Sequence, residues 1–126
     1  MKQSHTKPPN WDKLVELFGV SWGKTVVTYG DTCYCANPLS LDLEVHEAVH
    51  AVQQSNPVEW WDRYYVDKEF RLSQEIEAYK AQTKFLRKYV KDRNQLHRRL
   101  DSISRDLSGA MYGNCISYDE AYRRIK

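Results

Sequence analysis

The sequence lacks a long apolar run, internal repeats, low-complexity segments and a large excess of charge of either sign. No apolar segment approaches the roughly 20 residues that a membrane-spanning helix needs, which excludes a transmembrane protein. The amino terminus has no apolar segment typical of a cleaved secretory signal, so we expect a cytoplasmic protein. Three cysteines are an odd number, which favours buried thiols over a disulfide framework. A formal net charge of +2 is too small to indicate nucleic-acid binding by itself.

What the chain does have is the composition of one folded domain. It contains 126 residues, of which 41% are hydrophobic and 29% are charged, as in an ordinary globular protein. We therefore expect a single domain over residues 1–126. Residues 1–9, which end in two prolines, are predicted to be a flexible tail.

The pattern of residues predicts a mainly α-helical domain with a small β element, that is, an α+β fold. Residues 25–29 are β-branched or aromatic and predict a strand, and residues 33–36 predict a second one after a Gly-Asp turn. Capping residues and apolar spacing predict helices in the rest of the chain. The predicted helical segments are 11–18, 40–55, 57–65, 72–91, a stretch with Leu96 and Leu107 near its ends, and a last helix after Ser117.

One predicted helix carries the sequence His46-Glu47-Ala48-Val49-His50, which is the H-E-x-x-H pattern. Residues four apart lie about one helical turn apart on the same face, so both imidazoles can reach one metal ion. Glu47 projects beside them, where it can deprotonate a metal-bound water. The alternative is an ordinary amphipathic helix with solvated histidines, but the spacing and the acid in the required place favour a metal site.

The helical phase of this segment predicts that its apolar side packs on the core while the histidines line a cleft. At about 100° per residue, His46, His50 and Gln53 lie on a different face from the apolar residues. The predicted apolar stripe consists of Leu41, Val45, Ala48, Val49 and Val52.

A catalytic zinc site needs a third protein ligand, and the helix over 72–91 offers the best one. Glu75 lies in the middle of its apolar face, among residues such as Leu72, Tyr79 and Leu86. An unpaired carboxylate there costs several kcal/mol unless a cation binds it. Alternatively, Glu75 lies at a frayed helix start and pairs with an arginine, Arg63 or Arg71. The other candidate ligands are Glu59, Glu69, Glu77 and His97. Of these, Glu77 lies among lysines on the opposite face of the same helix.

These residues resemble the zincin metallopeptidases whose third ligand is a glutamate on a second helix, the gluzincins. The segment Glu75-Ile76-Glu77-Ala78-Tyr79 matches the E-x-x-A part of the motif common in that group, with Tyr79 where Asp or Asn is usual. The chain lacks the longer histidine motif of the metzincins. Its size is similar to that of minimal metallopeptidase-like proteins of bacteriophages and mobile elements, and the specific resemblance covers residues 40 to 90.

The resemblance implies a minimal zincin-like fold with an active-site helix and a glutamate-bearing second helix. It implies one zinc ion per chain on His46, His50 and Glu75, peptide-bond hydrolysis with Glu47 as general base, and a peptide or protein substrate. It also implies a phage-encoded protein that acts in the host cell, and a substrate held along the strand over 24–29. Tyr112, on a glycine-flanked loop, and His97 are candidate donors to the developing oxyanion.

Two alternatives from other functional classes stay open. The first is a zincin-like binding or regulatory module that holds a metal but hydrolyses little. The second is a basic nucleic-acid-binding helical domain, suggested by the basic run over 80–105. We do not expect this partner, because the lysines form one solvated helix face and acids such as Asp92, Asp101 and Asp106 interrupt the rest.

Overall fold

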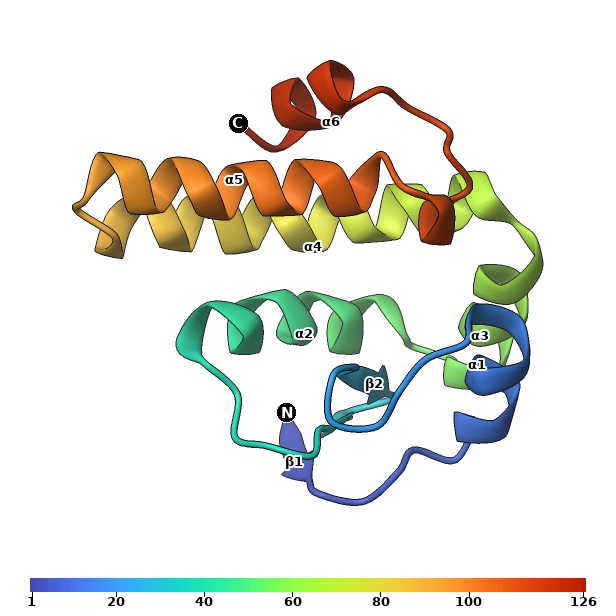
Figure 1. Cartoon of the computed structure of the whole chain (residues 1–126). Helices are drawn as coiled ribbons and strands as arrows, with labels where there is room; N and C mark the ends of the chain where they lie inside the picture. Colours follow the sequence, from blue (N-terminus) through green and yellow to red (C-terminus); the bar gives the residue numbers. More distant parts are fainter.

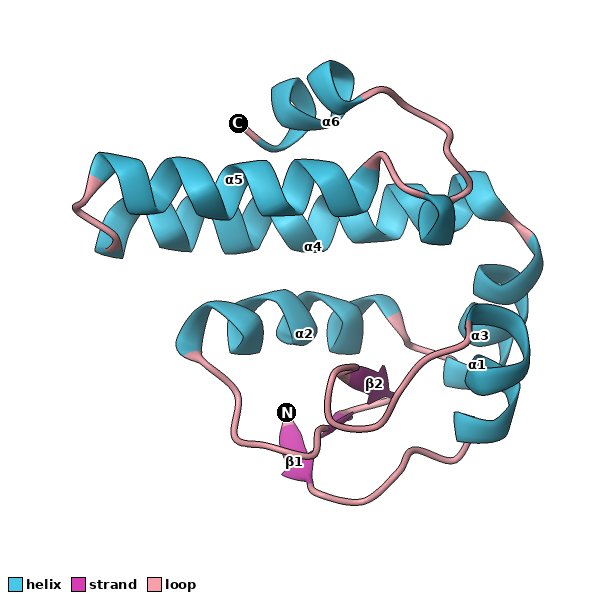
Figure 2. Cartoon of the chain, viewed as in Figure 1, coloured by secondary structure: helices cyan, strands magenta, loops and turns pink.

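The computed structural model describes residues 1–126 and has a mainly helical α+β architecture, as the sequence predicts (Figure 2). Six α-helices and one 3-10 helix accompany a single three-stranded sheet. None of the helices is both long enough and apolar enough to cross a membrane. In chain order the elements are β1 (Lys2–Ser4), α1 (Trp11–Phe18), β2 (Val27–Tyr29), β3 (Thr32–Tyr34), α2 (Leu41–Gln53), α3 (Pro57–Val66), α4 (Lys68–Tyr89), α5 (Arg93–Leu107), η1 (Ala110–Tyr112) and α6 (Tyr118–Ile125).

The sheet has the order β1-β3-β2 and corrects one prediction about the amino terminus. β2 and β3 form an antiparallel hairpin across the two-residue turn Gly30–Asp31, in which Gly30 has φ +65°. β1 pairs with β3 in parallel, with Lys2 opposite Thr32. Part of the segment predicted to be a flexible tail is therefore a strand. A parallel partner about 30 residues away leaves no local signal in the sequence.

Two helices, α3 and α6, begin with the side-chain caps that the sequence predicts. Asn56 accepts a hydrogen bond from the backbone N–H of Glu59, and Ser117 accepts one from that of Glu120. The prediction for α4 needs correction, because the helix begins at Lys68, with Asp67 as its cap, rather than at Leu72. Glu75 consequently lies two turns inside α4 and not at a frayed end.

The helices form layers on both sides of α4, with one hydrophobic cluster at each side of the molecule. Figure 1 shows α5 antiparallel to α4, α6 beyond α5, α2 on the opposite side of α4, and the sheet on the side of α2 away from α4. The cluster between α4, α5, η1 and α6 consists of Leu72, Ile76, Leu86, Leu100, Ile103, Leu107, Tyr112, Ala121 and Ile125. The cluster between α1, β2 and α3 consists of Trp11, Leu14, Val27, Trp60, Trp61 and Tyr64.

The orientation of α2 is the largest departure from the sequence prediction. Its apolar stripe is not buried: Leu41 is 67% and Val52 83% exposed, and Val45 and Val49 are half-buried. The buried face carries His46, Glu47 and His50 together with Asp42. Burial of polar groups is tolerated where each one finds a partner, and here the partners come from α4 and β2. Periodicity identified the two faces correctly but assigned the wrong one to the interior.

Candidate metal centre

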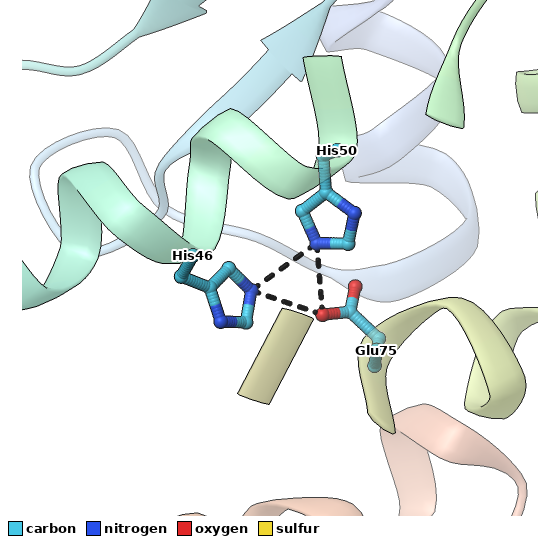
Figure 3. A group of neighbouring side chains, drawn as sticks. All are labelled: His46, His50 and Glu75. Atoms are coloured by element: carbon cyan, nitrogen blue, oxygen red, sulfur yellow. Dashed lines mark hydrogen bonds and ion pairs between the residues drawn. The ribbon is translucent and has the colours of Figure 1, made fainter. Parts of the chain in front are cut away.

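The three predicted metal ligands meet between α2 and α4. Both histidines project from α2 toward Glu75 of α4, and Figure 3 shows the three side chains pointing at one another. Glu75 Oε1 lies 3.2 Å from His46 Nε2 and 3.1 Å from His50 Nε2. The two Nε2 atoms are 3.1 Å apart, and all three residues are buried. This buried group could hold a metal ion.

The ring of His46 is oriented by an amide that is itself held by a carboxylate. Gln82 Nε2 donates to Asp42 Oδ2 over 2.8 Å, so Gln82 Oε1 faces His46 and accepts from its Nδ1–H over 2.9 Å. The Arg99 guanidinium of α5 pairs with the same Asp42 oxygen. Burial raises the pKa of Asp42, but hydrogen bonds from Gln82 and Ser40 and the Arg99 charge outweigh it and lower that pKa below its ordinary value.

The ring of His50 is oriented in the same way from the other side. Gln53 Nε2 donates to the backbone carbonyl of Gln74 over 3.0 Å, so Gln53 Oε1 accepts from His50 Nδ1–H over 2.8 Å. The side chain of Gln74 in turn accepts from the indole N–H of Trp60. The two amide oxygens thus favour a proton on Nδ1 of each histidine, so that each neutral ring directs its Nε2 lone pair toward Glu75, as metal coordination through Nε2 requires.

The carboxylate of Glu75 is held by Tyr64 of α3, whose hydroxyl donates to Oε2 over 2.7 Å. This bond leaves Oε1 for the two imidazoles. Neither arginine considered from the sequence pairs with Glu75. Arg63 pairs with Asp67, and Arg71 donates to the backbone carbonyls of Tyr64, Tyr65 and Met111.

When no metal ion is bound, the cluster favours a protonated His50. Burial disfavours the charged imidazolium, but the Glu75 carboxylate overcomes this and raises the pKa of His50 to about 9. Burial likewise disfavours the charged carboxylate, but the two histidines lower the pKa of Glu75 well below its ordinary value. Both shifts reflect a site that attracts positive charge.

Glu47 lies beside the ligands in the wall of a cavity of about 300 Å³. Thr28 of β2 donates from its hydroxyl to Glu47 Oε2 over 2.9 Å, which holds the buried carboxylate against the sheet. The three ligands, Trp60 and Trp61 also line this cavity. The cavity therefore brings a potential general base, a potential metal site and apolar surface together.

Of the other residues considered from the sequence, Tyr112 and Tyr79 lie at the cavity, and the remaining candidates do not. Tyr112, in η1, is buried and lines the same cavity, and burial raises its pKa well above the ordinary value. Tyr79 contacts His46 ring to ring, with centroids 4.4 Å apart, while Gln82 holds Nδ1 of that ring. The rejected ligand candidates are exposed and lie outside the cluster; they are Glu59, Glu69, Glu77 and His97.

Sequence reasoning missed the residues that support the ligands. Asp42 precedes His46 by one turn of α2, and Gln82 follows Glu75 by two turns of α4. Their helical phase therefore placed both on the ligand faces, and this signal could have found them. Tyr64 lies on a third helix and had no such signal.

Comparison with protein-family models, curated proteins and solved structures gave no match. The chemistry open to the site follows from its donor atoms. Two imidazole nitrogens and one carboxylate oxygen, brought together by three buried residues, could hold a divalent metal ion.

Proposed function

We propose that the protein is a zinc-dependent peptidase of the glutamate-liganded zincin kind, with one zinc ion per chain on His46, His50 and Glu75. The observation that carries the proposal is the convergence of two imidazole Nε2 atoms and one carboxylate oxygen within 3.1–3.2 Å of one another. Three acceptors this close repel one another unless a cation or a proton lies among them.

The spacing of the donors supports zinc. Zinc binds nitrogen and oxygen ligands at about 2.0–2.2 Å, usually as a tetrahedron, whose edges are then about 3.3 Å. The three observed separations of 3.1–3.2 Å are close to such edges. Three protein ligands leave a fourth position for water or substrate, which is the arrangement of catalytic rather than structural zinc sites.

Glu47 is the proposed general base. A zinc ion, when bound, supplies Lewis acidity that lowers the pKa of water and polarises a carbonyl group. Because Thr28 donates to Oε2 of Glu47, the other carboxylate oxygen is available to accept the proton of the attacking water. Glu47 then passes this proton to the leaving amine. Tyr112 lines the cavity, and its raised pKa means that its hydroxyl keeps the proton at neutral pH, so this hydroxyl is the proposed donor to the developing oxyanion.

The sheet suggests where an extended peptide lies. β2 is an edge strand that packs against α2, and residues 24–28 line the cavity. Gln54 covers the end of this edge, because its amide donates to the backbone carbonyl of Thr28 and accepts from the N–H of Gly30. The strand expected over 24–29 begins only at Val27, so the proposed place for a peptide or protein substrate to add as a strand is Val27 with the cavity-lining segment 24–26 before it.

The test is hydrolysis of a peptide library by zinc-loaded protein with Glu47→Gln, compared with Glu77→Gln as a control on the exposed face of α4. Glu47→Gln keeps the size of the side chain and removes the base, so it should keep zinc and lose about 10²–10⁴-fold in turnover. Glu77→Gln should behave as the wild type. Unchanged hydrolysis in zinc-loaded Glu47→Gln contradicts the mechanism. No hydrolysis by zinc-loaded wild type contradicts the peptidase and favours a regulatory module.

A further inference from the structure

The charges of the chain are divided between its two parts. Residues 80–126 contain twelve Lys and Arg against five Asp and Glu, whereas residues 1–79 contain seven against twelve. The basic part comprises the second half of α4 with α5, η1 and α6, on the side of α4 away from α2 and the sheet (Figure 1). Such a division of charge is typical of a protein with a polyanionic partner.

The cations are concentrated where α4 ends and α5 begins, at residues 84–98, here called the hairpin tip. Figure 1 shows the hairpin tip projecting past the start of α2. Its six cationic side chains are exposed, and none of them takes part in an ion pair. They are Lys84, Arg87, Lys88, Lys91, Arg93 and Arg98.

The acids that interrupt the basic run in the sequence have other partners in the structure. Asp92 caps α5 by accepting a hydrogen bond from the backbone N–H of Gln95. Asp101 pairs with Arg105 and accepts from the hydroxyl of Tyr118. Asp101 is thus paired outside the hairpin tip, whereas Asp92 lies within it, so the tip carries six cations against one acid.

An exposed aromatic ring lies among these cations. Tyr89, the last residue of α4, is 58% exposed. Its ring packs against Phe85 with centroids 4.6 Å apart, and Lys88 Nζ lies 5.3 Å from its centroid. An exposed aromatic ring beside several cations that have no ion-pair partner is a combination with which proteins hold single-stranded nucleic acid, because bases stack on the ring while cations contact phosphates.

We infer that the hairpin tip binds single-stranded nucleic acid, with its cations on the phosphates and Tyr89 stacked on a base. This replaces the expectation, drawn from the sequence, that the basic run is only a solvated helix face. A membrane surface fits less well, because Tyr89 is the only exposed large apolar side chain of the tip and no apolar row accompanies the cations. At 1.5 Å per residue, Lys88 lies about 20 Å along α4 from Glu75, so this surface is separate from the metal centre.

The test is fluorescence anisotropy of a labelled oligothymidine 20-mer with the zinc-loaded full chain at 50 to 200 mM salt. We expect binding, and the logarithm of the association constant should fall linearly with the logarithm of the salt concentration. The expected slope is about −3, as for four or five neutralised phosphates. Lys84→Gln with Lys88→Gln should weaken binding about tenfold and reduce the slope. Tyr89→Ala should weaken it about fivefold or more without changing the slope. Lys2→Gln with Lys7→Gln removes the same charge elsewhere and should have little effect.

Four outcomes would overturn the inference. The first is that the protein does not bind the oligonucleotide at 50 mM salt, and the second is that the two double lysine variants weaken binding equally. The third is equal affinity for a glutamate 20-mer of the same charge. The fourth is that the protein binds vesicles with anionic lipid and not the oligonucleotide. None of these measurements depends on hydrolysis, so the inference and the proposed peptidase can fail separately.

Discussion

Gln82 of α4 and Asp42 of α2 are 40 residues apart in the chain, yet Gln82 Nε2 donates a buried 2.8 Å hydrogen bond to Asp42 Oδ2. A carboxylate only accepts, so this bond determines which end of the amide faces His46. The tautomer of a proposed metal ligand thus depends on a carboxylate that does not contact the ligand, and on Arg99, which pairs with that carboxylate from α5.

Gln82→Leu should lower zinc affinity by about 10- to 100-fold, since partners of this kind orient the metal-bound imidazole. The dissociation constant is measured by competition with a chromophoric chelator. Gln95→Leu, on the exposed start of α5, is the matched control and should bind zinc like the wild type. Equal zinc affinity in the two variants would show that Gln82 does not position His46.

The metal-free protein should become less stable as the pH rises from about 6.5 to about 9. In the folded chain the pKa of His50 is about 9, against 6.5 for an ordinary histidine. A raised folded-state pKa stabilises the fold fully below the unfolded value, and this contribution is lost as the pH passes through the folded value. Urea unfolding in EDTA across this range measures the decline.

Zinc and His50→Gln are the two controls for this pH dependence. Zinc takes the place of the proton between the ligands, so the zinc-loaded protein should not show the decline. His50→Gln removes the titrating group and should flatten the curve of the metal-free protein. A stability that rises with pH over this range in the metal-free wild type would contradict the assignment of the proton to His50.

Val52 lies on the face of α2 that the sequence predicts to be buried, but in the structure this residue is exposed, so its replacement should cost little stability. Val52 is 83% exposed, so Val52→Ser should change the free energy of unfolding by about 0.5 kcal/mol or less. Leu86 is 2% exposed in the cluster between α4, α5 and α6, and Leu86→Ala should cost about 2–5 kcal/mol. Chemical unfolding of both variants measures the difference. A cost above 2 kcal/mol for Val52→Ser would mean that this face is buried.

Local signals in the sequence predicted much of the fold. The capping pairs Asn56 with Glu59 and Ser117 with Glu120 fixed two helix starts, because a cap depends only on residues three apart. The convergence of two histidines with Glu75 also followed from residue spacing, since helical phase determines which residues share a face.

Long-range contacts account for what the sequence did not predict. Helical phase does not say which face of α2 is buried, and here the polar face is buried because Gln82, Glu75 and Thr28 supply its partners. The pairing of β1 with β3 and the bond from Tyr64 to Glu75 likewise join distant segments.

Zinc content per chain is the most direct test of the metal centre. The protein is loaded with zinc, dialysed at neutral pH and analysed by plasma mass spectrometry, with Glu75→Ala and Glu77→Ala in parallel. One zinc per chain is predicted in the wild type and in Glu77→Ala, and loss of zinc in Glu75→Ala, which removes a ligand from the buried cluster. A wild type without zinc, or full zinc in Glu75→Ala with loss in Glu77→Ala, would contradict the site.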